Sequence, residues 1–325
     1  MEISHMKKHG ISILLVLLLN MIRLVVFPGS ISAQPYSHLS LDANRIQWSY
    51  LLYEVKSTSA DVTTEVRLEF PTQAEAKAAM IEAREGDPLP VPAAGCYKIT
   101  VNTFLDSALH APVKSVDHLW FDPQDATALG RDMLRQGDED FKKVFRFTKQ
   151  GVFRHQKEPK DKKEASFEPD KWTKVIDRFY PYDADKLGCP NIVDRLLLIY
   201  IVSASGALDN NQPLSLCVFG KRQLFSVKLR PAGSHPIKVN YIEQKGQGKD
   251  RQQAEIKAVK IDLEAKPLES NLENVENFSF MGFLNNISFS IEPARNLPVE
   301  IRGEIPPVGS VTLKLKEARL RKSHG

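Results

Sequence analysis

A long series of short segments rich in β-branched and aromatic residues constrains the fold of this chain more than any other feature. Residues 62–70, for example, alternate apolar and polar side chains, so one face of that strand should be buried and the other wet. Short turns separate the segments, as at residues 148–151, and such strands predict an antiparallel meander rather than βαβ units. The expected strands are residues 46–55, 62–70, 97–105, 113–121, 144–147, 152–154, 214–219, 224–229, 237–244, 255–263, 278–283, 286–291, 299–304 and 310–317.

Three segments carry helix signals instead. Residues 72–85, with Thr72 as N-cap, and residues 122–137 predict two surface helices. Residues 191–205 are apolar nearly all round, which predicts a buried helix ended by Gly206. The expected fold is therefore mainly β: a strongly curved antiparallel meander, open or partly closed into a barrel, with one buried core helix on its concave side.

The N-terminus has the pattern of a secretory signal. Lys7 and Lys8 precede the apolar run 11–22, and small residues follow at 28–33. The alternative is an uncleaved membrane anchor, but the run is shorter than the roughly 20 apolar residues that span a bilayer. We therefore expect a signal peptide over residues 1–33 and an exported product without a transmembrane segment. The remainder, residues 34–325, is expected to form one antiparallel β domain with a charged surface loop near 158–170.

Charge argues against a nucleic-acid partner. The formal net charge of +4 falls to about +2 once the signal is removed, which is too near neutral to attract a polyanion. Basic residues nevertheless gather in residues 141–163. This basic patch is either a solvated hairpin or a contact for anionic lipid head groups or acidic glycans. Its candidate residues are Lys142, Lys143, Arg146, Lys149 and Arg154.

Three cysteines remain in an exported product, where disulfides persist. We expect a bridge between Cys189 and Cys217, which flank one helical segment, with a chain-entropy stabilisation of roughly 3–4 kcal/mol. Free thiols throughout, or a bridge that includes Cys96, are the alternatives, because sequence separation does not reveal Cα distance.

Chemical motifs are scarce. Gly246-Gln247-Gly248-Lys249 lacks the length and following hydroxyl of a phosphate loop and is interpreted as a turn. Asp117 and His118 are adjacent on an expected strand and therefore point to opposite faces, so they cannot form one metal site from the same face. No metal and no cofactor are expected.

The C-terminal third resembles a known family. Residues 297–303, Leu-Pro-Val-Glu-Ile-Arg-Gly, followed by residues 306–313, resemble the end of the exported bacterial proteins grouped as domain of unknown function 3108. The apolar helix ending before Gly206 is similar to that family's core helix, and the resemblance covers roughly residues 172–320. It implies a periplasmic, mainly antiparallel β fold without an assigned activity, and no catalytic residues are carried over.

Two classes of function follow. The first is a non-catalytic binder of a lipid or other apolar envelope molecule, because a curved sheet can enclose an apolar cavity. The second is a structural or assembly factor that holds an envelope protein or an anionic glycan through its surface. The candidate cavity residues, which ordinary core packing would also explain, are Leu197, Tyr200, Ile201, Phe280, Phe283 and Phe289.

A glycan hydrolase is the third hypothesis, because paired carboxylates perform that reaction. Asp183, Asp185 and Asp194 lie close together in the chain. They also flank an expected helix start, where carboxylates favour the helix dipole. We therefore expect a protein that is not an enzyme.

Overall fold

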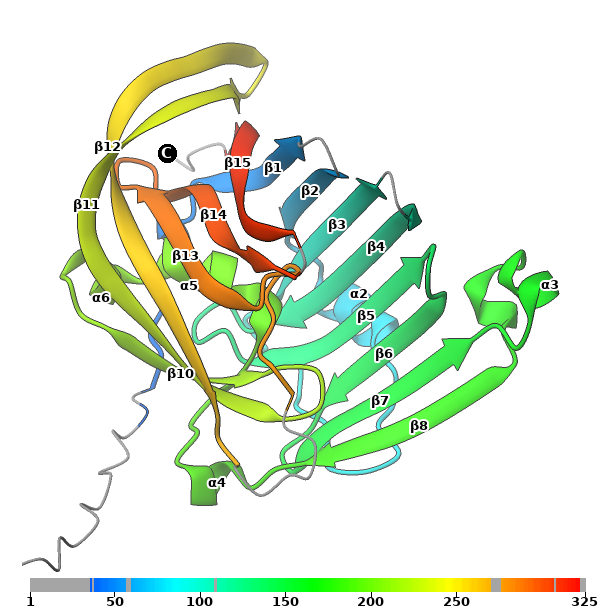
Figure 1. Cartoon of the computed structure of the whole chain (residues 1–325). Coiled ribbons are helices and arrows are strands. Elements are labelled where there is room, and N and C mark those ends of the chain that lie inside the picture. The colour runs from blue at the N-terminus through cyan, green and yellow to red at the C-terminus, as the bar shows by residue number, and fades with distance from the viewer. Residues whose placement is uncertain are drawn as a thin grey trace, which may run out of the picture. The chain divides into compact units, whose positions relative to one another are not determined.

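The computed structural model describes residues 36, 38–56, 60–107, 110–269, 276–306 and 308–321. The expected signal peptide lies outside these residues. In the described part, fifteen strands form one sheet in the order β8-β7-β6-β5-β4-β3-β2-β1-β15-β14-β13-β12-β11-β10-β9 (Figure 1). They are β1 (Trp48–Lys56), β2 (Ala60–Glu69), β3 (Tyr97–Ser107), β4 (His110–Phe121), β5 (Ala128–Gln136), β6 (Phe141–Phe147), β7 (Gly151–Glu158), β8 (Lys174–Pro181), β9 (Ile192–Asp194), β10 (Leu214–Phe219), β11 (Leu224–Lys245), β12 (Gly248–Pro267), β13 (Asn285–Glu292), β14 (Leu297–Ile305) and β15 (Gly309–Leu320).

Most neighbouring strands are antiparallel, and one long-range pairing closes part of the sheet into a ring. The end of β11, Ile242–Lys245, pairs in parallel with Glu317–Leu320 of β15. Strands β11 to β15 thus form a closed ring, whereas β1 to β8 continue from β15 as an open sheet. The expected fold class, a curved antiparallel sheet partly closed into a barrel, is confirmed.

The buried helix is confirmed in a shorter form. Helix α5 (Leu198–Ala204) is buried along its whole length and lies inside the curve of the sheet (Figure 1). The expected segment begins instead as strand β9, which pairs in parallel with β10, followed by the 3-10 turn η4 (Arg195–Leu197). Gly206 does not end the helix, because Ser205 is its C-cap and α6 (Gly206–Asp209) starts at Gly206.

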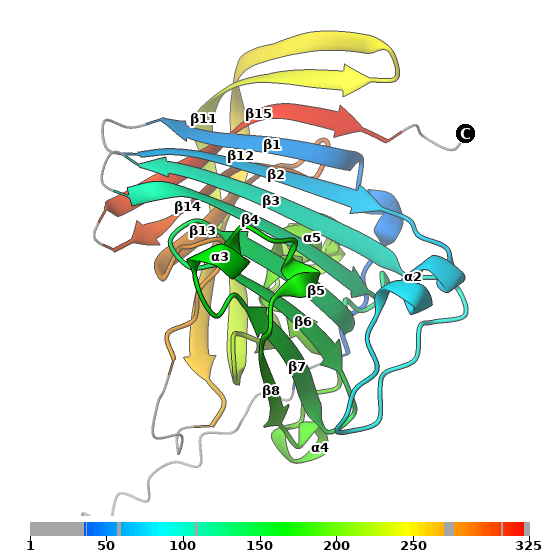
Figure 2. The ribbon, with the colours of Figure 1, turned by 90° about the vertical axis from the view of Figure 1, so that its right-hand side faces the viewer.

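One of the two expected surface helices is present. Helix α2 (Gln73–Ala79) starts at Thr72, whose side chain forms a capping box with Glu75, as the sequence predicts. It ends earlier than expected, at Met80, which is extended. Figure 2 shows α2 beside the strand ends, and a small second core of Ala76, Val91, Cys96, Trp120 and Leu129 lies in this region.

The prediction of a helix over residues 122–137 is wrong. Most of this segment is strand β5, which pairs with β4 and β6 on its two sides. The segment is rich in helix-forming residues, but hydrogen bonding to two neighbouring strands overrides that local preference.

Three further expectations about strands need correction. Residues 278–283 contain only an isolated bridge between Phe280 and Phe283. The two strands expected at 224–229 and 237–244 are one strand, β11, with a bulge between Pro231 and Ser234. Strand β8 was not expected, and the charged loop before it contains the short helix α3 (Lys162–Ala165). Another short helix, α4 (Ala184–Leu187), follows β8.

The main core lies between α5 and the concave face of the sheet. Trp48, Tyr53 and Phe121 are among its fully buried side chains. Within the described ranges, none of the helices combines the length and the apolar character needed to cross a bilayer.

Candidate functional site

The six candidate cavity residues all lie in this core. Tyr200 packs edge-on against Phe121, with ring centroids 4.8 Å apart, and donates its hydroxyl to the Pro123 carbonyl at 2.9 Å. The Phe283 ring packs on Gly303, where a Cβ would come within 2.7 Å of the Phe283 Cγ. All six are 0 % exposed, and none lines the three cavities described below, so a ligand role for them stays a prediction: Leu197, Tyr200, Ile201, Phe280, Phe283 and Phe289.

The predicted disulfide is confirmed. Cys189 and Cys217 are bonded, with Cα atoms 5.8 Å apart, and the bridge ties the segment before β9 to β10. Cys96 is a buried free thiol. The bridge is consistent with an exported protein, because disulfides persist in oxidising compartments.

The five basic-patch residues do not share one surface. Arg154 lies opposite Phe145 in the β6–β7 register, and Lys143 is two residues from Phe145 on β6. These side chains therefore point to the concave face, where Phe145 packs against Phe219.

The other three members of the patch lie elsewhere. Lys142 and Arg146 have the opposite parity on β6 and point to the outer face. There Lys142 forms an ion pair with Asp170 at 3.0 Å, and Arg146 donates to the Leu89 carbonyl at 2.6 Å. Lys149 is exposed in the β6–β7 turn.

Arg154 is the most unusual polar side chain on the concave face. It is only 9 % exposed, yet within the described residues its guanidinium has no hydrogen bond and no ion pair, and Nε is buried without a partner. Its guanidinium lies over the Tyr180 ring, whose centroid is 5.5 Å from the guanidinium carbon. Burial lowers the pKa of Arg154 most, and the positive charges of Arg222 and Arg178 lower it further.

Three more cations surround Arg154. Lys143 is half-buried, with Nζ 3.6 Å from the Phe141 ring centroid and no hydrogen bond or ion pair among the described residues. Arg178, which is exposed, lies opposite Arg154 in the β7–β8 register, and the β10–β11 turn supplies the exposed Arg222, which pairs with Glu276 at 3.2 Å. We call this group the inner cationic site: Lys143, Arg154, Arg178 and Arg222.

Burial and repulsion within the site both lower the pKa of Lys143. Burial, followed by the charge of Arg154, lowers the pKa of the Lys143 amine to about 8, although Glu139 and Glu158 oppose the shift. An anion bound among these cations would relieve both the repulsion and the missing hydrogen bonds.

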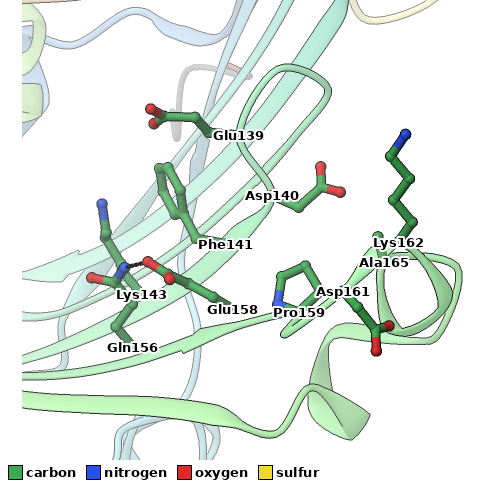
Figure 3. A pocket seen from close by; sticks show the side chains of 10 residues that line it. All are labelled: Glu139, Asp140, Phe141, Lys143, Gln156, Glu158, Pro159, Asp161, Lys162 and Ala165. Atoms are coloured by element: carbon green, nitrogen blue, oxygen red, sulfur yellow. Dashed lines mark hydrogen bonds between the residues drawn. The ribbon is translucent and has the colours of Figure 1, made fainter.

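A cavity of about 450 Å³ adjoins the site at Lys143 (Figure 3). It lies between the β5–β6 turn, strands β6 and β7, and helix α3. Its lining is mainly polar and charged: Glu139, Asp140, Phe141, Lys143, Gln156, Glu158, Pro159, Asp161, Lys162 and Ala165.

A second cavity of about 280 Å³ has a mixed lining: Phe225, Leu263 and Ile287 contribute apolar surface, and asparagines and Glu276 contribute polar surface. Glu276, the partner of Arg222, also lines it, so this ion pair connects the cavity with the inner cationic site. A third cavity, near Tyr36 and Pro190, measures only about 10 Å³.

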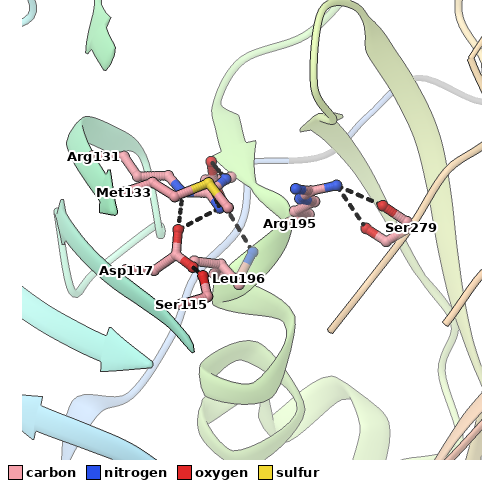
Figure 4. A network of polar contacts seen from close by, with 8 residues as sticks. Ser115, Asp117, Arg131, Met133, Arg195, Leu196 and Ser279 are labelled. Carbon is pink, nitrogen blue, oxygen red and sulfur yellow. Dashed lines mark hydrogen bonds and ion pairs between the residues drawn. The ribbon is translucent and has the colours of Figure 1, made fainter. Parts of the chain in front are cut away.

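Unlike Arg154, the arginines Arg131 and Arg195 have hydrogen-bonding partners. Arg131 donates to Asp117 at 2.6 Å and to Asp194 at 3.3 Å, joining β5 to β4 and β9 (Figure 4). Next to this network, Arg195 donates to the Ser279 hydroxyl at 2.6 Å. His118 is on the other face and hydrogen-bonds to Thr100 at 3.0 Å, as strand alternation predicts. The described residues contain no group of three side chains that could hold a metal ion.

The three aspartates considered for glycan hydrolysis have local structural roles at the starts of two short helices. Asp183 caps α4 and accepts from the Lys186 amide, whereas Asp194 caps η4 and accepts from the Leu196 amide. Asp185 lies in the first turn of α4. Helix capping therefore accounts for their position in the sequence, and the hydrolase hypothesis stays a prediction.

The fold thus defines a mainly β protein with a partly ringed antiparallel sheet. It is similar to the crystal structure of a beta-barrel-like protein of domain of unknown function 1849 from Brucella abortus. The match has a TM-score of 0.40 and 10 % sequence identity, and covers 86 % of this chain and 100 % of that chain. No family model and no curated protein matches the sequence. The resemblance to domain of unknown function 3108 is not confirmed; the comparison supports only a likeness to a domain of unknown function.

Proposed function

We propose that this chain is an exported, non-catalytic binding protein for an anionic lipid, whose charged head group is held by the inner cationic site. The observation that carries the proposal is the buried, unpartnered guanidinium of Arg154. A buried cation without a hydrogen-bonding partner is destabilising, and a bound phosphate or carboxylate would supply the missing acceptors.

Apolar surface around the cations supports a lipid over a small free anion. The Tyr180 ring beside Arg154 packs on Phe219, with centroids 6.0 Å apart. Beyond the Arg222–Glu276 ion pair lies the 280 Å³ cavity, whose mixed lining includes the apolar side chains of Phe225, Leu263 and Ile287. A ligand with an anionic group at Arg154 and a hydrocarbon part toward Phe225 would use both features.

The test is vesicle binding by the full chain. We expect the wild type to bind phosphatidylglycerol vesicles at least tenfold more tightly than phosphatidylcholine vesicles, and Arg154→Gln to lose most of that preference. Lys149→Gln is the matched control, because it removes one positive charge from the same hairpin outside the site. All variants carry the same N-terminal segment, so its own affinity for vesicles cancels in the comparison.

Two results would overturn the proposal. Equal losses in Arg154→Gln and Lys149→Gln would mean that only net charge matters. Saturable binding of inorganic phosphate without any preference for phosphatidylglycerol vesicles would mean that the site takes a free anion and not a lipid.

A further inference from the structure

We infer that the 450 Å³ cavity beside Lys143 holds a polyhydroxylated, sugar-type group, so that the ligand of the inner cationic site is an anionic glycolipid. The inference rests on the proposed function and narrows its ligand class. Apart from Lys143, which belongs to both, the cavity is lined by other side chains than those of the cationic site, so the inference can fail while the proposed function stands.

Carboxylates in the cavity are fixed as hydrogen-bond acceptors. Asp140 accepts from the Gly137 amide at 2.8 Å, and Asp161 accepts from the Glu164 amide at 2.9 Å. Glu158 accepts from Lys174 and from Gln156, and the hydrogen bond from Lys174 lowers its pKa most. Each carboxylate has further lone pairs, which can accept hydrogen bonds from ligand hydroxyls.

The charges that line the cavity favour a ligand with hydroxyl groups over a ligand with a second anionic group. Four carboxylates line the cavity, against the two amines of Lys143 and Lys162, so an anion would be repelled from its interior. Hydroxyl groups donate to carboxylates and accept from amines and amides, and the volume is in the range of small-molecule sites. The four carboxylates could also attract an ammonium ion, but one ammonium group would fill only a small part of the 450 Å³ cavity.

Lys143 connects the two subsites. It lines the cavity, and it lies two residues from the position opposite Arg154 on the same face of β6. Its amine rests on the Phe141 ring and has no hydrogen-bond acceptor among the described residues. Its three N–H donors can therefore serve both an anionic oxygen on the Arg154 side and a hydroxyl on the Gln156 side.

The test uses soluble probes on the full chain, measured by isothermal titration calorimetry. We expect glucose 1-phosphate to bind at least tenfold more tightly than inorganic phosphate. Glucose alone should bind at least tenfold more weakly than glucose 1-phosphate, because it lacks the anion. Ala165→Phe, which fills the cavity from α3, should remove the advantage of glucose 1-phosphate and leave phosphate affinity unchanged, whereas Ala165→Ser is the matched control.

The possible results distinguish a failure of the sugar subsite from a failure of the proposed function. Equal affinities for phosphate and glucose 1-phosphate would overturn the sugar subsite while leaving the cationic site intact. A tenfold advantage that survives in a folded Ala165→Phe variant would also overturn it, because the sugar would then bind elsewhere. No binding of either phosphate probe, in a wild type that also fails the vesicle test, would defeat the proposed function itself.

Discussion

Lys143 has an unusually low pKa for a lysine, and it lies between the inner cationic site and the 450 Å³ cavity. Burial and the neighbouring Arg154 lower the pKa of its amine to about 8, against an ordinary value near 10.4 for lysine. Because the folded state releases this proton first, the amine is neutral in the folded protein and still charged in the unfolded chain between those two values. The folded state consequently gains stability as pH rises through that window, while the inner cationic site loses one charge.

Anion binding should therefore depend on pH in a specific way. We expect the affinity of the wild type for sulfate, which stays a dianion over this range, to fall several-fold between pH 7 and pH 9, because Lys143 loses its charge. Lys143→Arg should keep its affinity over the same range, since arginine stays protonated. Calorimetric titrations at intervals of half a pH unit measure both curves, and parallel declines in the two proteins would assign the titration to another group.

Single residues show where sequence information was sufficient and where it was not. The basic residues around the β6–β7 turn are evident in the sequence, but alternation separates Lys143 and Arg154 from Lys142 and Arg146. Val152, Arg154 and Gln156 lie on one face of β7 and are all buried, so their alternation in the sequence was a usable signal that Arg154 shares the face of Val152. The missing partner of Arg154 depends on neighbours from β8 and the β10–β11 turn, which no local pattern reveals.

At the scale of elements, the disulfide fastens the smallest strand of the sheet. Strand β9 has three residues and pairs with β10, where Cys217 lies opposite Ile192. The bridge from Cys189 closes a loop of 28 residues, so reduction should release conformational freedom mainly in the unfolded chain. Because β9 leads directly into η4 and α5, its attachment also positions the buried helix.

We expect the double variant Cys189→Ala/Cys217→Ala to lose about 2–5 kcal/mol of unfolding free energy, the typical effect of removing a native bridge. Urea denaturation under non-reducing conditions measures it. Cys96→Ala is the control, because it removes a buried thiol from the small second core without opening a loop, and should cost about 1 kcal/mol. Equal losses in the two proteins would show that the bridge contributes only packing.

Elements were predictable where local chemistry agreed with long-range pairing. Thr72 and Glu75 mark the start of α2 in the sequence, and the structure uses both in the capping box. Residues 128–136 carry few β-branched side chains, so the sequence predicts a helix there, but β4 and β6 pair with both edges of this segment. In the same way, an uninterrupted apolar run over 191–205 conceals the division into β9, η4 and α5, which only the pairing with β10 determines.

For the described part of the chain as a whole, the closure between β11 and β15 decides how the sheet is arranged. The two paired segments are separated by the entire β12–β14 meander, and neither has a sequence signal for the other. The fold class could be predicted from the alternation of apolar and polar side chains, because this pattern indicates which face of each strand is buried. The closure of the ring between β11 and β15 could not be predicted, because it depends on the length of β11 and on its bulge at Pro231–Ser234.

Closure makes a prediction about hydrogen exchange. Glu317–Leu320 of β15 pairs with β1 on one side and with β11 on the other, so its backbone groups have partners at both edges. Residues 249–257 of β12 pair only with β11, because the pairing of β12 with β13 begins at Val259. We therefore expect slow deuterium uptake at 242–245 and 317–320, and uptake at least tenfold faster at 249–257.

A chain ending at Lys316 should remove the partner of Ile242–Lys245 and accelerate exchange there, while uptake at 249–257 stays as it was. A chain ending at Arg321 is the matched control, because it retains the whole of β15 and should exchange like the wild type. Mass spectrometry of peptic peptides resolves the three segments. Rapid uptake at 242–245 in the intact protein would mean that the ring is open in solution, with β11 and β12 forming a free hairpin arm beyond the sheet.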